Sequence, residues 1–309
     1  MSVPTLARHH GYLEGVGGLR LHYRTWEPAR PRAAALVVHD LGEHGGRYAP
    51  LAEHLADRGF VTIAPDLRGH GRSDGRRGHV SRFEVFLQDL DRFRREAQGL
   101  TEPGSPLFLL AAGLGGLVAL RYLQEFGAPV SGAVLAAPWI GGAPFQPTSA
   151  SLARALGRIL PALRLSAGLG AARADRGIAG GPPHGDDPLA HDAFTPRLYQ
   201  EVTAATTQVF QRRGRIAAPL LVLLGEEDRV ADPERAAALL RSLDRPALEV
   251  RHCAGRAHDL LGVADAEPLL SMVVAWLEDQ LERYTAETAV GAGTLLALGR
   301  PAEHTAARP

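Results

Sequence analysis

The stretch LFLLAAGLGGLVAL, residues Leu107 to Leu120, decides the fold of this chain. It opens with a continuous apolar run that ends at Ala112, and such a run is typical of a buried β-strand. A turn of small residues follows, and the residues from Gly115 to Phe126 then show a helical pattern. A strand that passes through a tight turn into a helix is the repeating unit of a parallel sheet.

The same alternation continues on both sides of this stretch. The expected strands lie at residues 19–28, 33–40, 60–66, 106–112, 130–139, 219–228 and 248–255. The expected helices lie at residues 48–59, 80–100, 115–126, 232–243 and 267–284. The strand at 19–28 alternates in polarity, which predicts an edge strand. Together these elements predict an α/β fold with a mostly parallel sheet that is covered by helices on both faces.

One segment, residues 141–215, interrupts the alternation. It holds an apolar helical stretch at 151–165 and a Gly/Pro-rich stretch at 177–188. An insertion after a central strand usually lies over the carboxyl ends of the strands, where ligands bind in open α/β sheets, so we expect it to form a cap. The core is then expected at 1–140 and 216–284. The tail at 285–309 lacks sustained periodicity and is predicted to be disordered.

Charge and composition exclude several partners. The 34 acidic and 34 basic residues cancel, which argues against nucleic acid or an anionic membrane as the main partner. No apolar run approaches the roughly 18 residues of a membrane span. The single cysteine, Cys253, cannot form an internal disulfide, so we expect a cytoplasmic protein. No cofactor and no metal are predicted, and the oligomeric state stays open.

Several motifs together resemble one known family. They are HDLGEHGGRYAPLAEHLADRGF (39–60), APDLRGHGRSDGRRGHV (64–80), LVALRYL (117–123), DDPLAH (186–191) and GEEDRVADPE (225–234). As a set they resemble the monoacylglycerol lipase and lysophospholipase branch of the α/β-hydrolases, over roughly residues 10–284. The resemblance implies a mostly parallel sheet with a helical cap between strands six and seven. It also implies cleavage of carboxylic esters by a serine, an aspartate and a histidine in that chain order.

Two of these three residues are present. Asp228 matches the family's acid at the end of the seventh strand, and His258 matches its base after the eighth strand. A carboxylate that fixes and stabilises the imidazole is what this chemistry requires, so the two side chains should lie within hydrogen-bonding distance. The nucleophile should stand in the middle of G-x-S-x-G, but here Ala111–Gly115 reads AAGLG, and Gly113 occupies the serine position.

The resemblance maps the oxyanion hole, which is made of two backbone N–H groups, onto Leu41 and Leu114. The family usually has His-Gly before the first donor, whereas this chain has His39-Asp40. A carboxylate at Asp40 would repel a developing oxyanion unless it is protonated or points away, and Asp40 is also a possible acid.

No other residue replaces the nucleophile convincingly. Ser105 precedes the strand, Ser73 lies in a different loop, and Cys253 is expected to be a buried small hydrophobe. Gly113 easily adopts the strained backbone of the turn. A serine restored there is predicted to stand beside His258.

Three functions remain open. The first is a pseudoenzyme that binds an acyl or other apolar small molecule without hydrolysing it. The second is a lyase or isomerase that uses His258 with Asp228 as a general base. The third is a residual carboxylic ester hydrolase. In each case the predicted cavity is floored by Gly113, Leu41, Leu114 and His258 and roofed by apolar residues of Leu152 to Leu165.

Overall fold

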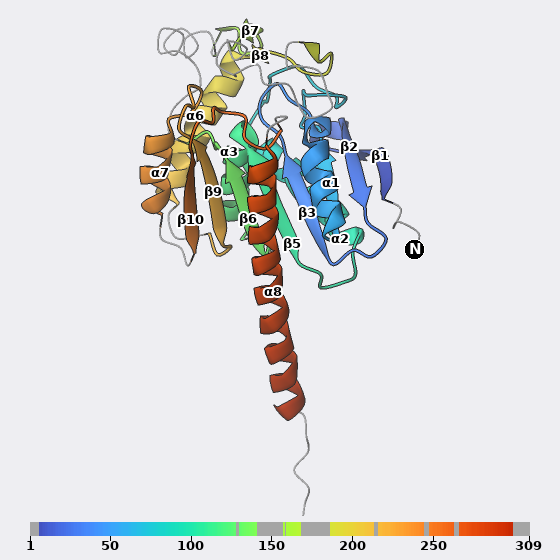
Figure 1. The fold of residues 1–309 in the computed structure, drawn as a ribbon. Coiled ribbons are helices and arrows are strands. Elements are labelled where there is room, and N and C mark those ends of the chain that lie inside the picture. Colours follow the sequence, from blue (N-terminus) through green and yellow to red (C-terminus); the bar gives the residue numbers. More distant parts are fainter. Residues whose placement is uncertain are drawn as a thin grey trace, which may run out of the picture.

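The computed structural model describes residues 6–127, 130–140, 157, 159–167, 186–212, 216–243, 247–262 and 266–298. The main sheet consists of β1 (Ala7–Glu14), β2 (Arg20–Glu27), β3 (Ala33–Val38), β4 (Phe60–Pro65), β5 (Leu107–Ala112), β6 (Gly132–Ala136), β9 (Leu220–Gly225) and β10 (Leu248–Cys253). The α-helices with described bounds are α1 (Ala49–Asp57), α2 (Glu84–Gly99), α3 (Gly113–Phe126), α6 (Pro196–Gln211), α7 (Pro233–Arg241) and α8 (Glu267–Leu298). Two short 3-10 helices lie at Val16–Gly18 and Gly45–Tyr48. Figure 1 shows how these elements are arranged.

The strands of the main sheet follow the order β1-β2-β4-β3-β5-β6-β9-β10. The pairs β1–β2 and β2–β4 are antiparallel, and all others are parallel, which confirms the predicted fold class. The prediction of an edge strand at 19–28 is wrong, because β2 is covered by β1. The sequence ARHHGYLE of β1 is polar and mostly exposed, so no apolar pattern marks it as a strand.

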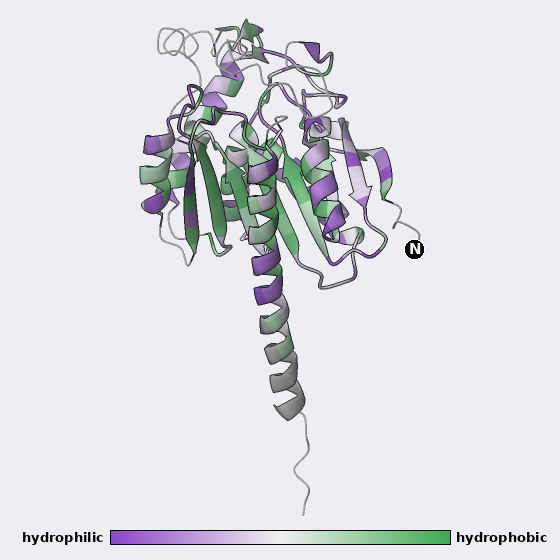
Figure 2. Cartoon of the chain, in the orientation of Figure 1, coloured by the Kyte–Doolittle hydropathy of each residue, from purple (hydrophilic) through white to green (hydrophobic). Residues whose placement is uncertain are grey.

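Helices cover both faces of the sheet and create two apolar layers. Alternate residues of each inner strand point to opposite faces, so Leu36 and Val38 join one layer while Ala35 and Val37 join the other. Helices α2, α3, α6 and α7 complete the first layer, and α1 and α8 complete the second. The central strands are accordingly the most hydrophobic part of the ribbon (Figure 2).

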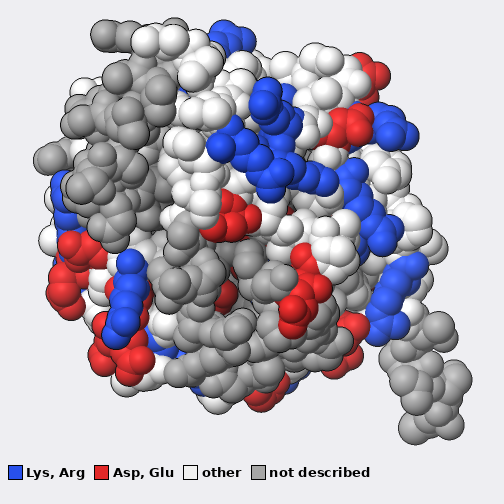
Figure 3. All heavy atoms as spheres, turned by 90° about the horizontal axis from the view of Figure 1, so that it is seen from above, with Lys and Arg blue, Asp and Glu red and all other residues white. Residues whose placement is uncertain are grey.

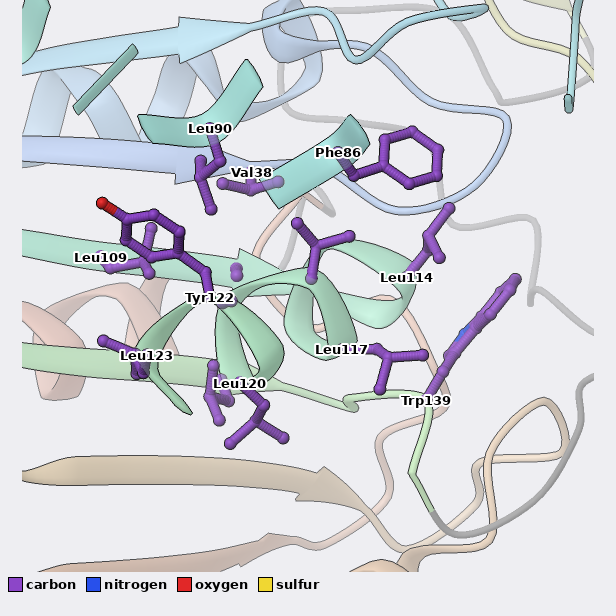
Figure 4. Packing of buried hydrophobic residues seen from close by; sticks show 14 of the residues in the cluster. Val38, Phe86, Leu90, Leu109, Leu114, Leu117, Leu120, Tyr122, Leu123 and Trp139 are labelled. Atoms are coloured by element: carbon purple, nitrogen blue, oxygen red, sulfur yellow. The ribbon is translucent and has the colours of Figure 1, made fainter. Parts of the chain in front are cut away.

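Helix α3 is anchored at its first turn by the core. Leu114 and Leu117 are fully buried and point from α3 toward the layer that contains Val38 and Trp139 (Figure 4). Full burial of such a leucine contributes about 1.5–3 kcal/mol. Gly115 permits the close approach, because a Cβ there would lie 2.6 Å from the carbonyl oxygens of Val38 and His39. The turn between β5 and α3 is therefore fixed against the end of β3.

The insertion falls between β6 and β9, the sixth and seventh strands of the main sheet, as predicted. Its described elements with defined bounds are a short antiparallel pair, β7 (Leu165–Ser166) with β8 (Ala193–Phe194), and helix α6. Thr195 caps α6 by accepting a hydrogen bond from the Leu198 N–H, and Pro196 occupies its first turn. Residues 152–156 and 158 of the predicted roof lie outside the described residues, and the cap and its boundaries stay a prediction.

Helix α6 packs against α3 rather than standing apart from the core. The Gln124 side chain donates to the Val209 carbonyl oxygen at 2.8 Å, and Arg121 donates to the Gln208 side chain at 2.9 Å. Apolar residues of α6 belong to the same layer as α3. The final part of the insertion is therefore rigidly attached to the helix that begins at Gly113.

The last helix is longer than predicted. The apolar periodicity predicts an end at Tyr284, whereas α8 continues to Leu298 and extends beyond the body of the molecule (Figure 1). No proline interrupts the chain until Pro301, so helical hydrogen bonding can continue after the apolar periodicity ends. Among the described helices, α8 included, none combines the length and apolar character required to span a bilayer.

Candidate active site

The predicted site residues gather at the carboxyl ends of the central strands. Asp40 follows β3, Gly113 follows β5, and Asp228 and His258 follow β9 and β10. Because neighbouring parallel strands end at the same edge of the sheet, residues far apart in sequence meet there. Trp139, which follows β6, also reaches this point.

Asp228 and His258 are paired. The Nδ1 atom of His258 lies 2.8 Å from Oδ2 of Asp228. The other carboxylate oxygen of Asp228 accepts hydrogen bonds from the N–H groups of Val230 at 2.7 Å and Ala231 at 2.9 Å. Both side chains are 2% exposed. The turn after β9 thus fixes the carboxylate, and the carboxylate fixes the ring.

The two N–H groups that match the oxyanion hole converge on one atom. Oδ1 of Asp40 accepts hydrogen bonds from the N–H groups of Leu41 and Leu114, both at 2.6 Å. The carboxylate therefore does not point away from the position that the resemblance maps to the oxyanion hole. It occupies that position.

The second oxygen of Asp40 lies where a nucleophile would be. Oδ2 is 3.0 Å from Nε2 of His258. An ideal Cβ on Gly113 would lie 2.0 Å from Cγ of Asp40, and Gly113 itself has a φ of +49°. The expectation that a serine at position 113 simply stands beside His258 is therefore wrong, because the Asp40 carboxylate already occupies that space.

His258 is held as a cation. Burial by itself lowers the pKa of His258, but the hydrogen bonds to Asp228 and Asp40 and the charges of both carboxylates outweigh burial and raise the pKa to about 10. The ring then donates a proton to each carboxylate. Trp139 Nε1 lies 3.4 Å from His258 Nε2. At neutral pH an imidazolium in this position cannot act as a general base.

Asp40 is better described as an acceptor than as the predicted possible acid. Its oxygens face the N–H groups of Leu41 and Leu114 and the imidazolium of His258. An ionised carboxylate satisfies three N–H donors, whereas a carboxylic acid would turn an O–H toward one of them. We therefore assign Asp40 as an anion in this arrangement.

The charge on His258 can be measured directly. A nitrogen NMR titration of the imidazole is expected to show a protonated ring at neutral pH, with deprotonation near pH 10. Because the folded-state pKa exceeds the ordinary value of 6.5, pairing stabilises the fold fully below about pH 6.5, and this contribution is lost as the pH rises through about 10. Asp40→Asn is expected to lower the pKa. A neutral ring at pH 7 in the parent protein would contradict this assignment.

Residues of the loop after β3 position Asp40, and the sequence pattern does not predict this role for them. The Asp40 N–H donates to Glu43 at 3.2 Å, and the Tyr48 hydroxyl donates to the same carboxylate oxygen at 2.8 Å. Arg47 lies 3.6 Å from the other oxygen of Glu43. These residues stand in the quoted motif HDLGEHGGRY, and only their contacts show that they support the carboxylate.

His39 also supports the loop. Its Nδ1 lies 2.7 Å from the Asp40 carbonyl oxygen, and its Nε2 accepts the Leu67 N–H at 2.8 Å, which corresponds to a neutral ring. Burial lowers the pKa of His39, in keeping with this state.

The alternative nucleophiles lie elsewhere. Ser73 donates to the Asp66 carbonyl oxygen in the loop after β4, and Ser105 lines a groove of about 1020 Å³ at the amino ends of the strands. Cys253 is buried, and burial raises the pKa of its thiol. None of the three is placed beside His258.

The space beside Gly113 is small. A cavity of about 10 Å³ is lined by Asp40, Gly113, His258 and Tyr48 with their neighbours, which is close to the volume that one water molecule needs. Leu41 and Leu114 do not line it. The described residues contain no cluster of ligands that would hold a metal ion. From above, the surface carries both acidic and basic side chains among uncharged ones (Figure 3).

Comparisons with known proteins agree on the family. The family model described as "Serine aminopeptidase, S33" matches residues 29–265. The monoacylglycerol lipase of Mycolicibacterium smegmatis is 29% identical over 276 residues, which are 86% of this chain and 96% of that protein. The monoglyceride lipase of Homo sapiens is 31% identical over 233 residues, which are 74% of this chain and 76% of that protein.

Solved structures show the same architecture. The monoacylglycerol lipase of Paleococcus ferrophilus, 30% identical, matches with a TM-score of 0.71 and covers 89% of this chain and 99% of its own. A soluble variant of the monoglyceride lipase of Saccharomyces cerevisiae, 21% identical, has a TM-score of 0.74 and covers 91% of this chain and 96% of its own. At 21% identity, the similarity to the Saccharomyces cerevisiae structure shows a shared fold and nothing more.

Proposed function

This chain belongs to the serine aminopeptidase family of α/β-hydrolases, among its lipase- and esterase-like members, and we propose that it binds an acyl or other apolar small molecule without hydrolysing it. The observation that carries this proposal is the position of Asp40. Its carboxylate accepts both N–H groups that would stabilise an ester oxyanion, at 2.6 Å each. The absence of a serine at position 113 and the occupation of both N–H groups by Asp40 would therefore each prevent ester hydrolysis.

The apolar nature of the ligand is supported by two observations. The relatives named above are lipases of monoacylglycerols or monoglycerides. In the insertion, Ile159 and Leu160 are 77% and 50% exposed, and large exposed apolar side chains often mark binding surfaces. A cytoplasmic location stays a prediction that rests on the single cysteine.

The two alternatives receive less support. A lyase or isomerase that uses His258 as a general base needs a neutral ring, but the pKa of His258 is raised to about 10 while Asp40 stays paired with it. A residual ester hydrolase needs a nucleophile beside His258, and that place holds the Asp40 carboxylate.

The test separates binding from hydrolysis. The folded protein is expected to resist labelling by a fluorescent alkyl fluorophosphonate and to show no burst with p-nitrophenyl acetate, because nothing beside His258 can be acylated. Removing the serine of a triad typically costs about a millionfold in turnover. In the same samples, glycerol monodecanoate is expected to raise the melting temperature and to be recovered intact.

A serine-containing monoglyceride lipase serves as the positive control for both reagents. Ester turnover by this protein at a comparable rate would overturn the loss of hydrolysis. No thermal shift with the monoacylglycerol, decanol or decanoate would overturn the proposed binding.

A further inference from the structure

The proposed ligand has no room beside Gly113 in the observed arrangement of the described residues. The cavity there measures about 10 Å³, which is space for one water molecule, and the Asp40 carboxylate accepts the N–H groups of Leu41 and Leu114. Binding of an acyl ligand at this point therefore requires Asp40 to move. The contacts that hold Asp40 lead from the loop after β3 into the insertion between β6 and β9.

The first of these contacts lie within the loop itself. One carboxylate oxygen of Glu43 accepts the Asp40 N–H at 3.2 Å and the Tyr48 hydroxyl at 2.8 Å. Its other oxygen lies 3.6 Å from Nε of Arg47, which is 2% exposed. A buried guanidinium is strongly destabilising unless carboxylates compensate its charge. The position of Glu43, and with it that of Asp40, therefore depends on the other partners of Arg47.

The insertion provides another carboxylate for Arg47. Oδ2 of Asp187 lies 3.5 Å from Nη1 of Arg47 and accepts a hydrogen bond from Nε2 of His44 at 2.9 Å. Oδ1 of Asp187 accepts the Leu189 N–H at 2.9 Å. Burial raises the pKa of Asp187, but the hydrogen bonds from His44 and Leu189 and the charge of Arg47 lower it below its ordinary value. Asp187 is therefore an anion at neutral pH.

A second attachment joins the same parts of the chain. The His191 N–H donates to the Gly42 carbonyl oxygen at 2.9 Å, and Nε2 of His191 lies 3.1 Å from the Gly69 carbonyl oxygen. Residues 187–191 thus contact the loops after β3 and β4. Separation of the insertion from these loops would break the contacts of Asp187 and His191 together.

We propose that Asp187 is a positioning residue for Asp40, so that a ligand which separates the insertion from the loop after β3 also withdraws the Asp40 carboxylate. Once Asp187 has left, Glu43 remains as the carboxylate beside the buried charge of Arg47. A closer pair between Glu43 and Arg47 draws Glu43 away from the Asp40 N–H.

Withdrawal of Asp40 has two consequences for the site. The N–H groups of Leu41 and Leu114 become free to bind the carbonyl oxygen of an acyl ligand. His258 loses one of the two carboxylates that raise its pKa, so the charge of the ring reports the movement. This inference rests on the proposed binding of an acyl ligand and adds how that ligand gains access.

A nitrogen NMR titration of His258 tests the positioning role without a ligand. Asp187→Asn keeps the size of the side chain and removes its charge. It is expected to lower the pKa of His258 from about 10 by about one pH unit, toward that of Asp40→Asn. Asp186→Asn removes the same charge at the exposed neighbouring position and should leave the pKa of His258 unchanged. A lower melting temperature of Asp187→Asn with an unchanged pKa of His258 would show a merely structural role and overturn the proposal.

The route through Glu43 is tested by a double-mutant cycle. Glu43→Gln is also expected to lower the pKa of His258. Addition of Asp187→Asn to Glu43→Gln should lower it no further, because both changes act on the same chain of contacts. Fully additive effects of the two substitutions would overturn this route.

Glycerol monodecanoate tests the movement in the parent protein, where no variant has to fold. At saturation it is expected to lower the pKa of His258 in the parent and to cause no further decrease in Asp40→Asn. Because coupling between two events is reciprocal, Asp187→Asn should bind glycerol monodecanoate about fivefold or more tightly than the parent in calorimetry.

The outcomes distinguish this inference from the proposed function. A raised melting temperature with an unchanged pKa of His258 would overturn the coupling and leave ligand binding in place. No thermal shift with the monoacylglycerol, decanol or decanoate would overturn the proposed binding and the ligand-driven movement with it. The comparison of Asp187→Asn with Asp186→Asn would then still decide whether Asp187 positions Asp40.

Discussion

The double substitution Gly113→Ser with Asp40→Gly is expected to convert an unlabelled protein into one that fluorophosphonates label and that hydrolyses activated esters. Removing the carboxylate empties the hole and the space beside Gly113 in one change. It also removes one of the two carboxylates that raise the pKa of His258, so the ring can accept the proton of the new serine. One oxyanion-hole donor is worth about 2.7–4 kcal/mol, so the reopened hole matters as much as the hydroxyl.

Each single substitution is a matched control. Gly113→Ser alone should stay unlabelled and lose stability, because its Cβ would lie 2.0 Å from Cγ of Asp40. Asp40→Gly alone should stay unlabelled because it has no nucleophile. The measurements are gel fluorescence after labelling and the initial rate with p-nitrophenyl acetate. A folded double variant that resists labelling, or equal labelling of Gly113→Ser alone, would contradict the assigned geometry.

Asp66→Ala is expected to destabilise the fold by about 3–5 kcal/mol, because it leaves buried charged and polar partners without their acceptor. Asp66 is fully buried at the end of β4. Its carboxylate accepts hydrogen bonds from His22, Arg24 and the N–H groups of Gly45 and Arg72, at distances of 2.8–3.2 Å. These bonds connect the loop after β4 with the loop that positions Asp40.

The loss is measured by urea unfolding, with Asp57→Ala as the control at an exposed position, where the change should stay within about 0.5 kcal/mol. Burial alone would raise the pKa of Asp66, but hydrogen bonds from His22 and Arg72 and the charge of Arg24 lower it far below its ordinary value. The stabilisation is thus present above the ordinary pKa and is lost as the pH falls. The difference between the parent and Asp66→Ala should therefore shrink in acid. A loss no larger than that of Asp57→Ala would contradict this role.

The sequence alone determined the fold class and the identity of the altered site. The apolar run of β5 and the helical pattern of α3 predict a strand, a turn and a helix, because the periodicity of side-chain burial differs between the two elements. The chain order of Gly113, Asp228 and His258 located the site. Strand β1 was not predicted, because its exposed polar side chains do not show the alternation of apolar and polar residues that marks a half-buried strand.

The role of Asp40 was decided only by the tertiary structure. From the sequence, its carboxylate was expected to repel an oxyanion, to point away from the hole or to act as an acid. The observed contacts join residues up to 218 positions apart, from Asp40 to His258. These contacts depend on the register that sets Val38 of β3 beside Ala111 of β5. They also depend on Gly113, which has no side chain and so leaves space for the Asp40 carboxylate. Sequence patterns record which face of an element is buried, whereas the direction of one side chain is set by the donors that surround it in space.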